Sequence, residues 1–288
     1  MRIALVVNSR SRSARPEAVE AALWNFGADV ERFDVDAAGS AAASRPDRLA
    51  VAGGDGSIGP AAAAAGRSGL PLAVIPAGTA NDFARRMRLP RRLEDACWLA
   101  VQGQRLQALE LGTMTAGGSP SLANGRPFVN VASLGLPAPA AARARSWKRA
   151  LGQFAYALGA LHAGLTADPV RCRVACDGRV LHDGPAWQVT VACSGAFGAG
   201  SSLEGADPAD GLLDVVAIPA GSRLRLPGLA YALRRERLPG RTGVPHARGR
   251  SAEVDAPPRA TFNVDGELVA AGPARFGVQP GAFQLVAG

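Results

Sequence analysis

The chain has 288 residues and a formal net charge of +8, with 48% hydrophobic and 19% charged residues. This length exceeds what one hydrophobic core usually supports, so we expect two domains. No apolar run approaches the roughly 20 residues that cross a bilayer, and the N-terminus is too short for a signal peptide, so we expect a cytoplasmic protein. A basic surface favours anionic partners such as nucleotide phosphates or acidic lipids, whereas no nucleic-acid module signature is present and we expect no nucleic acid to bind.

The first hundred residues alternate short apolar runs with helical patterns. Each apolar run is bounded by turn residues, which is typical of buried strands. The predicted strands are Arg2–Val7, Val30–Phe33, Leu49–Ala52 and Leu72–Ile75, and the predicted helices include Pro16–Phe26 and Arg92–Gly103. Strands that alternate with helices predict a parallel, doubly wound sheet.

From about residue 104 the pattern changes to short β-rich runs separated by Gly, Pro, Asp and Asn. The predicted strands are Leu106–Leu111, Pro127–Ser133, Val170–Cys176, Trp187–Cys193, Leu213–Ile218, Ala252–Val254, Ala260–Val264 and Arg275–Val278. Strands at this spacing predict an antiparallel β-sandwich, which two helical stretches, Ala138–Gly164 and Leu224–Arg237, interrupt. We therefore predict an α/β domain over residues 1–104 and a sandwich over 105–278. A return of residues 279–288 to the first domain stays open.

Two glycine-centred turns directly follow predicted strands, and the first is Gly53–Gly59, with the sequence GGDGSIG. Backbone amides without a neighbouring Cβ let a phosphate approach the main chain closely. Asp55 would act on such a phosphate through a cation, because carboxylate and phosphate repel each other. A tight strand-to-helix turn that needs glycine only for its shape is the alternative.

The second turn is Pro76–Arg85, with the sequence PAGTANDFAR. Thr79 supplies a hydroxyl and Asn81 an amide. Asp82 suits an N-cap or a cation-organising carboxylate, and Arg85 follows one helical turn later. A capped helix after a loop is the alternative. Two such turns in succession indicate a phosphate-binding crevice at one edge of a parallel sheet.

These motifs resemble the diacylglycerol kinase catalytic family of bacterial lipid kinases, which is related to sphingosine kinases and more distantly to NAD kinases. GGDGS is similar to the family's nucleotide loop and PAGTANDFAR to its second signature. Further segments resemble family motifs in the same order: FVNVASLGL (Phe128–Leu136), KRALGQFAY (Lys148–Tyr156), PADGLLDV (Pro208–Val215) and NVDGE (Asn263–Glu267). Motifs in this order are more specific than any one of them.

The resemblance implies a two-domain fold with ATP in the cleft between the domains. It assigns the nucleotide to Asn8, Gly53, Gly54, Asp55, Gly56, Ser57, Ile58, Gly59, Thr79 and Asn81. It makes Glu267 the general base that takes the proton from a lipid hydroxyl, with Asp265 beside it. The family also holds a structural Mg²⁺ in its DGLL turn, which maps to the side chain of Asp210 and main-chain oxygens of Asp207 and Leu212.

Carboxylates that gather Mg²⁺ are expected at the reaction centre, because phosphoryl transfer needs the phosphate charge to be neutralised. Asp55, Glu110 and Glu267 are the candidates for this catalytic cation, which binds few protein oxygens and several waters. The DGE stretch has a second interpretation, since Asp-Gly is a strong signal for a type I′ hairpin turn. On sequence alone, both interpretations stay open.

Lys148 is the only lysine in the chain, and with Asp82 and Arg85 it is a candidate for contact with phosphate or a lipid headgroup. A solvated position on its helix is the alternative. The stretch Arg223–Arg250 holds eight arginines interleaved with leucines, a composition that suits the surface of an anionic bilayer. Packing of its leucines on the sandwich, with a solvated basic face, is the alternative.

The sequence therefore predicts a cytoplasmic lipid kinase that binds transiently to the inner face of the membrane. It would use ATP and Mg²⁺ to phosphorylate diacylglycerol or a related lipid. Two alternatives stay open: an NAD kinase-like phosphotransferase, and a catalytically weak nucleotide- or lipid-binding regulator with the same fold. The regulator rests on Gly59-Pro60, where the family usually continues with Asn and Glu. Glu110 also departs from the family's aspartate, and a homodimer is a further open alternative.

Overall fold

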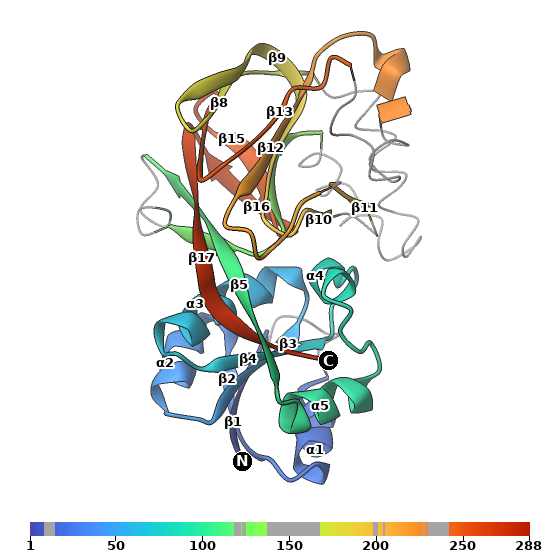
Figure 1. Cartoon of the computed structure of the whole chain (residues 1–288), viewed down its shortest axis with the longest axis vertical. Helices are drawn as coiled ribbons and strands as arrows, with labels where there is room; N and C mark the ends of the chain where they lie inside the picture. Colours follow the sequence, from blue (N-terminus) through green and yellow to red (C-terminus); the bar gives the residue numbers. More distant parts are fainter. Residues whose placement is uncertain are drawn as a thin grey trace.

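A computed structural model of the chain has two lobes, an α/β lobe at the bottom of Figure 1 and a β-rich lobe at the top. Both ends of the chain lie in the α/β lobe (Figure 1). The described residues are 1–8, 15–117, 122, 125–136, 168–197, 201–203, 205–226, 228–229 and 242–288. Lys148 and the predicted helix Ala138–Gly164 lie outside them, as does most of the predicted helix Leu224–Arg237.

The α/β lobe contains a parallel sheet with the strand order β2-β1-β3-β4. Its strands are β1 (Arg2–Val7), β2 (Asp29–Asp34), β3 (Arg48–Gly53) and β4 (Pro71–Pro76). Its helices are α1 (Pro16–Asn25), the 3-10 turn η1 (Val35–Ala37), α2 (Ala38–Ala43), α3 (Asp55–Arg67), α4 (Asp82–Arg86) and α5 (Leu93–Gln102). Helices α2 and α3 pack together on one side of the sheet and α1 and α5 on the other (Figure 1). The predicted doubly wound sheet is confirmed.

The cover on both faces explains why these strands are continuous apolar runs. Leu5, Val51 and Ile75 are fully buried, as expected for a parallel sheet between two helical layers. Neighbouring strands β3 and β4 run in the same direction, so their carboxyl ends meet at one edge. The two glycine turns that follow these strands are therefore brought side by side.

The β-rich lobe is the predicted antiparallel sandwich. Its strands are β5 (Arg105–Ala116), β6 (Arg126–Phe128), β7 (Val131–Gly135), β8 (Val170–Cys176), β9 (Arg179–Ala192), β12 (Leu213–Pro219), β13 (His246–Gly249), β14 (Ser251–Asp255), β15 (Ala260–Val264), β16 (Glu267–Ala271) and β17 (Ala274–Ala287). The short pair β10 (Ala196–Phe197) and β11 (Ser201–Ser202) and the 3-10 turn η3 (Arg223–Arg225) complete it. In the core, the ring of Phe276 lies 6.3 Å from that of Phe128 and 5.9 Å from that of Phe262.

Strand β17 joins the two lobes. It pairs antiparallel with β14 in the sandwich and parallel with β4 in the α/β lobe, where Gln284 lies opposite Pro71. The long strand β5 follows it antiparallel, with a register shift between Gln279 and Phe283 (Figure 1). Among the described residues, one 15-stranded sheet therefore runs through both lobes.

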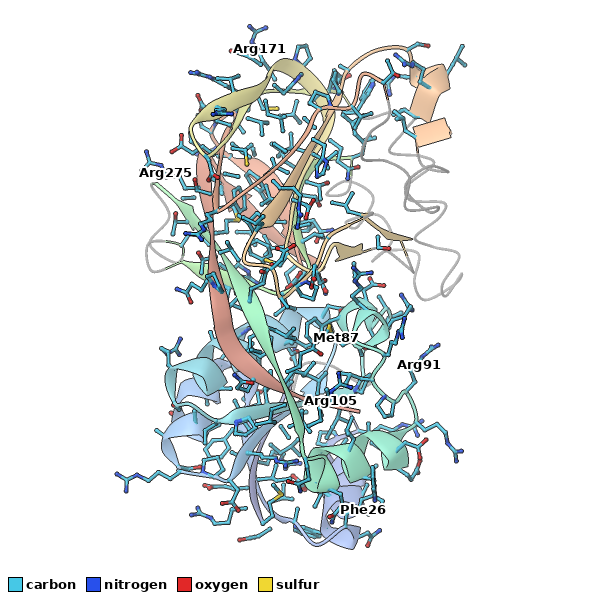
Figure 2. The ribbon with its side chains drawn as sticks, viewed as in Figure 1. Phe26, Met87, Arg91, Arg105, Arg171 and Arg275 are labelled. Carbon is cyan, nitrogen blue, oxygen red and sulfur yellow. The ribbon has the colours of Figure 1, made fainter. Side chains whose placement is uncertain are left out.

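The cysteines and arginines are placed as their surroundings in the sequence suggest. All four cysteines are free and buried, as their apolar surroundings predict. Arginines such as Arg91, Arg171 and Arg275 project outward from both lobes, so the positive charge is spread over the molecule (Figure 2). In the part of the chain that the structure describes, no helix is long and apolar enough to span a membrane.

Candidate active site

The two glycine turns touch each other at the edge of the α/β sheet. Gly54 is the N-cap of α3, and a Cβ built on it would lie 3.3 Å from the α-carbon of Gly78. The N–H of Ala77 also donates to the carbonyl of Gly53 at 2.9 Å. Asn8 directly follows β1 at the same edge, and Thr79 is exposed. Most of the residues predicted to bind nucleotide are thus brought together.

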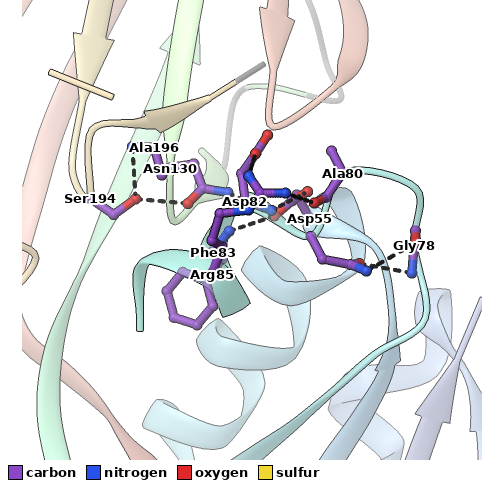
Figure 3. A network of polar contacts seen from close by, with 10 residues as sticks. Asp55, Gly78, Ala80, Asp82, Phe83, Arg85, Asn130, Ser194 and Ala196 are labelled. Atoms are coloured by element: carbon purple, nitrogen blue, oxygen red, sulfur yellow. Dashed lines mark hydrogen bonds and ion pairs between the residues drawn. The ribbon is translucent and has the colours of Figure 1, made fainter. Parts of the chain in front are cut away.

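Asp55 is the centre of a polar network between the two lobes (Figure 3). Its carboxylate accepts the N–H groups of Asp82 at 3.2 Å and Phe83 at 2.9 Å, which fixes the start of α4. It also accepts the side-chain amide of Asn130 from the sandwich at 3.1 Å. Asn130 in turn accepts the hydroxyl of Ser194 at 2.7 Å. The carboxylate predicted for phosphate chemistry therefore holds the junction of the lobes in place.

The second turn is held by its own side chains. Asn81 has a left-handed backbone (φ 51°), accepts the N–H of Gly78 at 2.8 Å and donates to its carbonyl at 3.0 Å. Asp82 is the first residue of α4 rather than its N-cap, and it pairs with Arg85 at 2.6 Å. Arg85 also donates to the carbonyl of Ala80 at 2.7 Å (Figure 3). These polar side chains build the shape of the loop, so main-chain groups are left to face a ligand.

The DGE stretch is a two-residue hairpin turn between β15 and β16. Asp265 and Gly266 both have positive φ, at 46° and 89°, as a type I′ turn requires. Asp265 is 8% exposed and accepts the N–H groups of Val129, Asn130 and Val131 at 2.8, 3.0 and 2.9 Å. Burial raises the pKa of Asp265 to about 7, although these N–H groups act in the opposite direction. Asp265 thus ties the hairpin to the segment before β7.

Glu267 directly follows this turn and reaches the other lobe. A Cβ built on Gly56, in the first turn of α3, would lie only 2.9 Å from Oε1 of Glu267. The Glu267 side chain is 47% exposed, and its Oε2 pairs with Arg126 at 2.5 Å. The hairpin interpretation is therefore confirmed, and the same turn places Glu267 against the first glycine turn. The catalytic interpretation stays a prediction.

The remaining residues of the GGDGS turn lie within α3. Ser57 and Ile58 are buried. A Cβ on Gly59 would lie 2.8 Å from the carbonyl oxygen of Pro127, so glycine is needed for α3 to pack closely on β6. Pro60 continues the helix. Contact between the lobes thus explains glycine at position 59, whereas the regulator alternative stays open.

Glu110 does not lie with Asp55 and Glu267. It is 2% exposed, accepts the N–H of Gly211 at 2.7 Å and donates its own N–H to the carbonyl of Pro208 at 2.9 Å. Burial, followed by the nearby aspartates of the DGLL turn, raises the pKa of Glu110 to about 7. Within the described residues, no three acidic, histidine or cysteine side chains converge on a metal site. The three carboxylates predicted for one catalytic cation are therefore not brought together.

Three residues at the junction were not predicted as site residues: Arg126, Asn130 and Ser194. Asn130 could have been found, because a polar residue inside the apolar segment Phe128–Leu136 calls for a buried partner. Arg126 had no distinguishing signal in so arginine-rich a sequence. Lys148 lies outside the described residues, so its predicted contact with substrate stays a prediction.

A cavity of about 360 Å³ opens on the sandwich, and no residue of the glycine turns lines it. Its apolar wall is formed by Trp187, Ile218, Leu229 and Val244. Trp187 lies in the C-terminal half of β9, and Ala192 at the end of this strand pairs with Val131, beside Asn130. Trp187, Ala192 and Val131 belong to one buried cluster, which connects the wall of the cavity to the segment that carries Asn130.

Comparisons with known proteins agree with this architecture. Residues 4–114 match the diacylglycerol kinase catalytic domain, and residues 130–287 match the YegS C-terminal NAD kinase beta sandwich-like domain. A probable lipid kinase YegS-like protein of Pseudomonas aeruginosa is 32% identical over 289 residues, which cover 95% of this chain and 86% of the relative. A diacylglycerol kinase of Mycobacterium tuberculosis is 26% identical over 253 residues, which cover 86% of this chain and 79% of the relative.

The fold has a counterpart of known structure. A putative diacylglycerol kinase from Bacillus anthracis superposes with a TM-score of 0.77 at 20% identity, covering 100% of this chain and 97% of that protein. The two family matches together span nearly the whole chain; the first ends within β5 and the second begins at Asn130. The chain therefore belongs to the family of diacylglycerol kinase-like and YegS-like lipid kinases.

Proposed function

We propose that this chain is an ATP-dependent kinase that transfers the γ-phosphoryl group to the hydroxyl of diacylglycerol or a related lipid. The observation that carries the proposal is the position of Glu267, whose Oε1 would lie 2.9 Å from a Cβ on Gly56. A carboxylate from the sandwich thus stands beside the glycine turn of the α/β lobe. This is the arrangement that an acceptor hydroxyl needs, with a proton acceptor on one side and a phosphate on the other.

The α/β lobe would bind the phosphates of ATP. Helix α3 begins at Asp55, at the edge where the parallel strands end, so its N-terminus and the glycine amides are available to anionic oxygens. The contacts of Asp55 with Asp82 and Phe83 hold the start of α4 beside the same turn. A preorganised main chain of this kind stabilises phosphate charge without rearrangement during the reaction.

Glu267 would act as the general base. The oxygen of the lipid hydroxyl forms a bond to the γ-phosphorus, its proton passes to the carboxylate of Glu267, and ADP leaves with the bridging oxygen. Arg126 pairs with Oε2 of Glu267 and leaves Oε1 directed at the turn. Its guanidinium also adds positive charge close to where the phosphoryl group would lie. Arg126 is therefore a positioning residue for the base.

Magnesium would enter with the nucleotide as MgATP. The described carboxylates do not form a three-ligand cage, so the ion would be held chiefly by phosphate oxygens and water. We therefore derive no step that depends on an ion bound to the protein alone. Asn81 and Thr79 lie at the turn where the nucleotide would bind, with Asn81 fixing the loop around Gly78.

The lipid class is supported by the cavity of the sandwich. Its volume of about 360 Å³ lies in the range of small-molecule sites. Its apolar side chains would contact acyl chains, and Ser222, Arg225 and Thr242 in the same lining would contact a polar headgroup. Leu224 at this cavity is 90% exposed and stands between Arg223 and Arg225. An exposed leucine flanked by arginines suits transient contact with an anionic bilayer, from which the substrate would enter.

The decisive experiment is the replacement Glu267→Gln. The amide keeps the shape of the side chain but cannot accept the proton, so we expect turnover to fall by about 10²- to 10⁴-fold. Binding of ATP should change little, because the glycine turns are untouched. Turnover is measured with ATP and a panel of lipid alcohols in mixed micelles, with NAD as a separate acceptor, and ATP binding is measured by calorimetry.

The matched control is Glu253→Gln, an exposed glutamate on β14 that pairs with Arg275 at 3.4 Å. This variant should keep full turnover. Retained lipid phosphorylation in Glu267→Gln would contradict the role of Glu267. Phosphorylation of NAD but of no lipid alcohol by the wild type would show that the acceptor class is wrong.

A further inference from the structure

The DGLL turn lies where the two lobes join. A Cβ on Gly211 in this turn would lie 3.1 Å from Cγ of Pro280, within the irregular part of β17. The turn is bonded on its other side to Glu110 of β5, through the N–H of Gly211 and the carbonyl of Pro208. The turn therefore packs against both of the strands that connect the lobes.

Acidic side chains gather at this turn. Asp207, Asp210 and Asp214 all raise the pKa of Glu110 through their negative charge. Asp214 is fully buried, and its Oδ1 lies 2.7 Å from Nε2 of His246, from which it accepts a hydrogen bond. Carboxylates this close repel one another, so the turn needs a compensating positive charge. In the resemblance drawn from the sequence, a divalent cation at Asp210 supplies that charge.

The structure places an arginine at this position instead. Both oxygens of Asp210 are engaged: Oδ1 accepts the N–H of Leu212 at 2.9 Å, and Oδ2 pairs with a terminal nitrogen of Arg248. The Nε of Arg248 lies 3.4 Å from Oδ1 of Asp214. The register of β12 and β13 produces this contact, because Asp214 and Arg248 are directly opposite each other.

A divalent cation does not fit this arrangement. Mg²⁺ requires nearly octahedral oxygen ligands at short distances, and a guanidinium on Asp210 excludes it from the carboxylate. Arg248 remains charged under all ordinary conditions, and its planar fork reaches two carboxylates at once. Burial opposes this charge, but Asp214 and Asp210 outweigh it and raise the pKa of Arg248 above its usual range.

We infer that Arg248 replaces the structural cation of the DGLL turn, so that this chain keeps the turn without a divalent ion. One arginine of the stretch Arg223–Arg250 thereby has an internal role, in β13, rather than a place on a membrane-facing helix. The inference concerns the stability of the turn and does not depend on the proposed reaction.

Thermal unfolding without nucleotide or lipid tests it, in EDTA and in millimolar MgCl₂. The wild type should unfold at the same temperature in both. Arg248→Gln should lower the unfolding temperature by about 4 °C or more in EDTA, because the carboxylates lose their partner. Magnesium should then restore part of the loss, since Asp210 becomes free to bind it. Arg250→Gln, which removes a nearby arginine with no contact to Asp210, is the matched control and should not respond to Mg²⁺.

Two results would overturn the inference. One is an unfolding temperature of Arg248→Gln that equals the wild-type value in EDTA. The other is a Mg²⁺-dependent rise in the wild type that disappears in Asp210→Asn, which would place an ion at Asp210 beside Arg248. The second comparison needs no Arg248 variant, so it decides the question even where Arg248→Gln fails to fold.

Discussion

The two lobes contribute to the candidate site in different ways. In the α/β lobe, Asp55, Asn81 and Asp82 are all bonded to neighbouring main chain or side chains, and they fix the shapes of two loops. In the sandwich, Asp265 gathers three N–H groups in the same manner, but Glu267 is half exposed and has Arg126 as its ion-pair partner. The polar residues that make the motifs recognisable mostly stabilise the structure, whereas the proposed chemistry depends on the less constrained carboxylate of Glu267.

This contrast separates stability from activity. Replacement of a loop-building side chain should reduce both, because the loop and the fold share the same hydrogen bonds. Replacement of Glu267 should reduce activity alone. Asn130 donates its main-chain N–H to Asp265 and its side-chain amide to Asp55, so one residue couples the hairpin of the sandwich to the first turn of the α/β lobe.

We expect the largest effect from Asp55→Asn, which tests whether a loop-building side chain supports both stability and activity. The new amide group would point a donor at the N–H groups of Asp82 and Phe83, and a buried donor without an acceptor costs about 1–3 kcal/mol. We expect the unfolding temperature to fall by several degrees, at about 2–4 °C per kcal/mol. Turnover should fall by about 10²-fold, because the displaced turn misplaces the phosphates. Calorimetry and initial rates check the two effects.

Asp95→Asn on α5 is the matched control, since Asp95 is 59% exposed and only 3.9 Å from Arg92. It should leave both quantities unchanged. Loss of turnover in Asp55→Asn without any loss of stability would contradict the structural role of Asp55 and would indicate a direct role in the chemistry.

A second test concerns pH, through Glu110→Gln. The carboxyl of Glu110 releases its proton near pH 4.5 in the unfolded chain but only near pH 7 in the folded one. Between these values the folded chain binds more protons, so stability falls as the pH rises from about 4.5 to 7 and stays lost above. The difference corresponds to about 3 kcal/mol, and Glu110→Gln should remove this part of the fall.

Burial shifts the pKa of Asp265 in the same direction, so the slope should become shallower in Glu110→Gln without vanishing. Denaturant unfolding at a series of pH values between 4 and 8 measures how the free energy of unfolding depends on pH. An unchanged slope in the variant would show that Glu110 is ionised in the folded protein throughout this range.

The smallest expected effect comes from Gly56→Ala, which tests the contact between the lobes directly. The added methyl group must push the Glu267 carboxylate away, because its Cβ would lie 2.9 Å from Oε1. Turnover should fall by about 10-fold, whereas stability should hold or rise, since alanine favours a helix over glycine. Gly39→Ala in α2 is the control, because a Cβ there meets nothing within 4 Å. Equal turnover in the two variants would contradict the position of Glu267.

Much of the fold could be predicted from the sequence, because local patterns determine it. Buried parallel strands are short apolar runs, and the alternation of strands with helices implies the doubly wound sheet. The extent of β17 could not be predicted. Gln279, Pro280 and Gly281 form a typical turn sequence, yet the chain passes through them as an irregular strand and reaches β4. Only pairing with distant β5 makes that path stable.

The candidate site was predictable where a motif determines its own local backbone conformation. The Asp-Gly pair predicts a hairpin, and the hairpin then sets the position of Glu267. The partners of these residues were not predictable, because Arg126, Asn130 and Ser194 reach the site through the packing of one lobe on the other. The same reason placed Glu110 at Gly211 rather than at Asp55, since a strand register and a bulge decide which way it faces.

The paired strands β5 and β17 also constrain how the lobes can move. Both run from one lobe into the other as a curved two-stranded ribbon (Figure 1). A change in the angle between the lobes must therefore bend this ribbon, and its regular pairing is interrupted between Gln279 and Phe283, beside the DGLL turn. The irregular part of the ribbon packs against the DGLL turn at Pro280, and Glu110 of β5 is hydrogen-bonded to the same turn. Stiffness at the junction should therefore depend on residues of the ribbon and the DGLL turn, which lie outside the candidate active site.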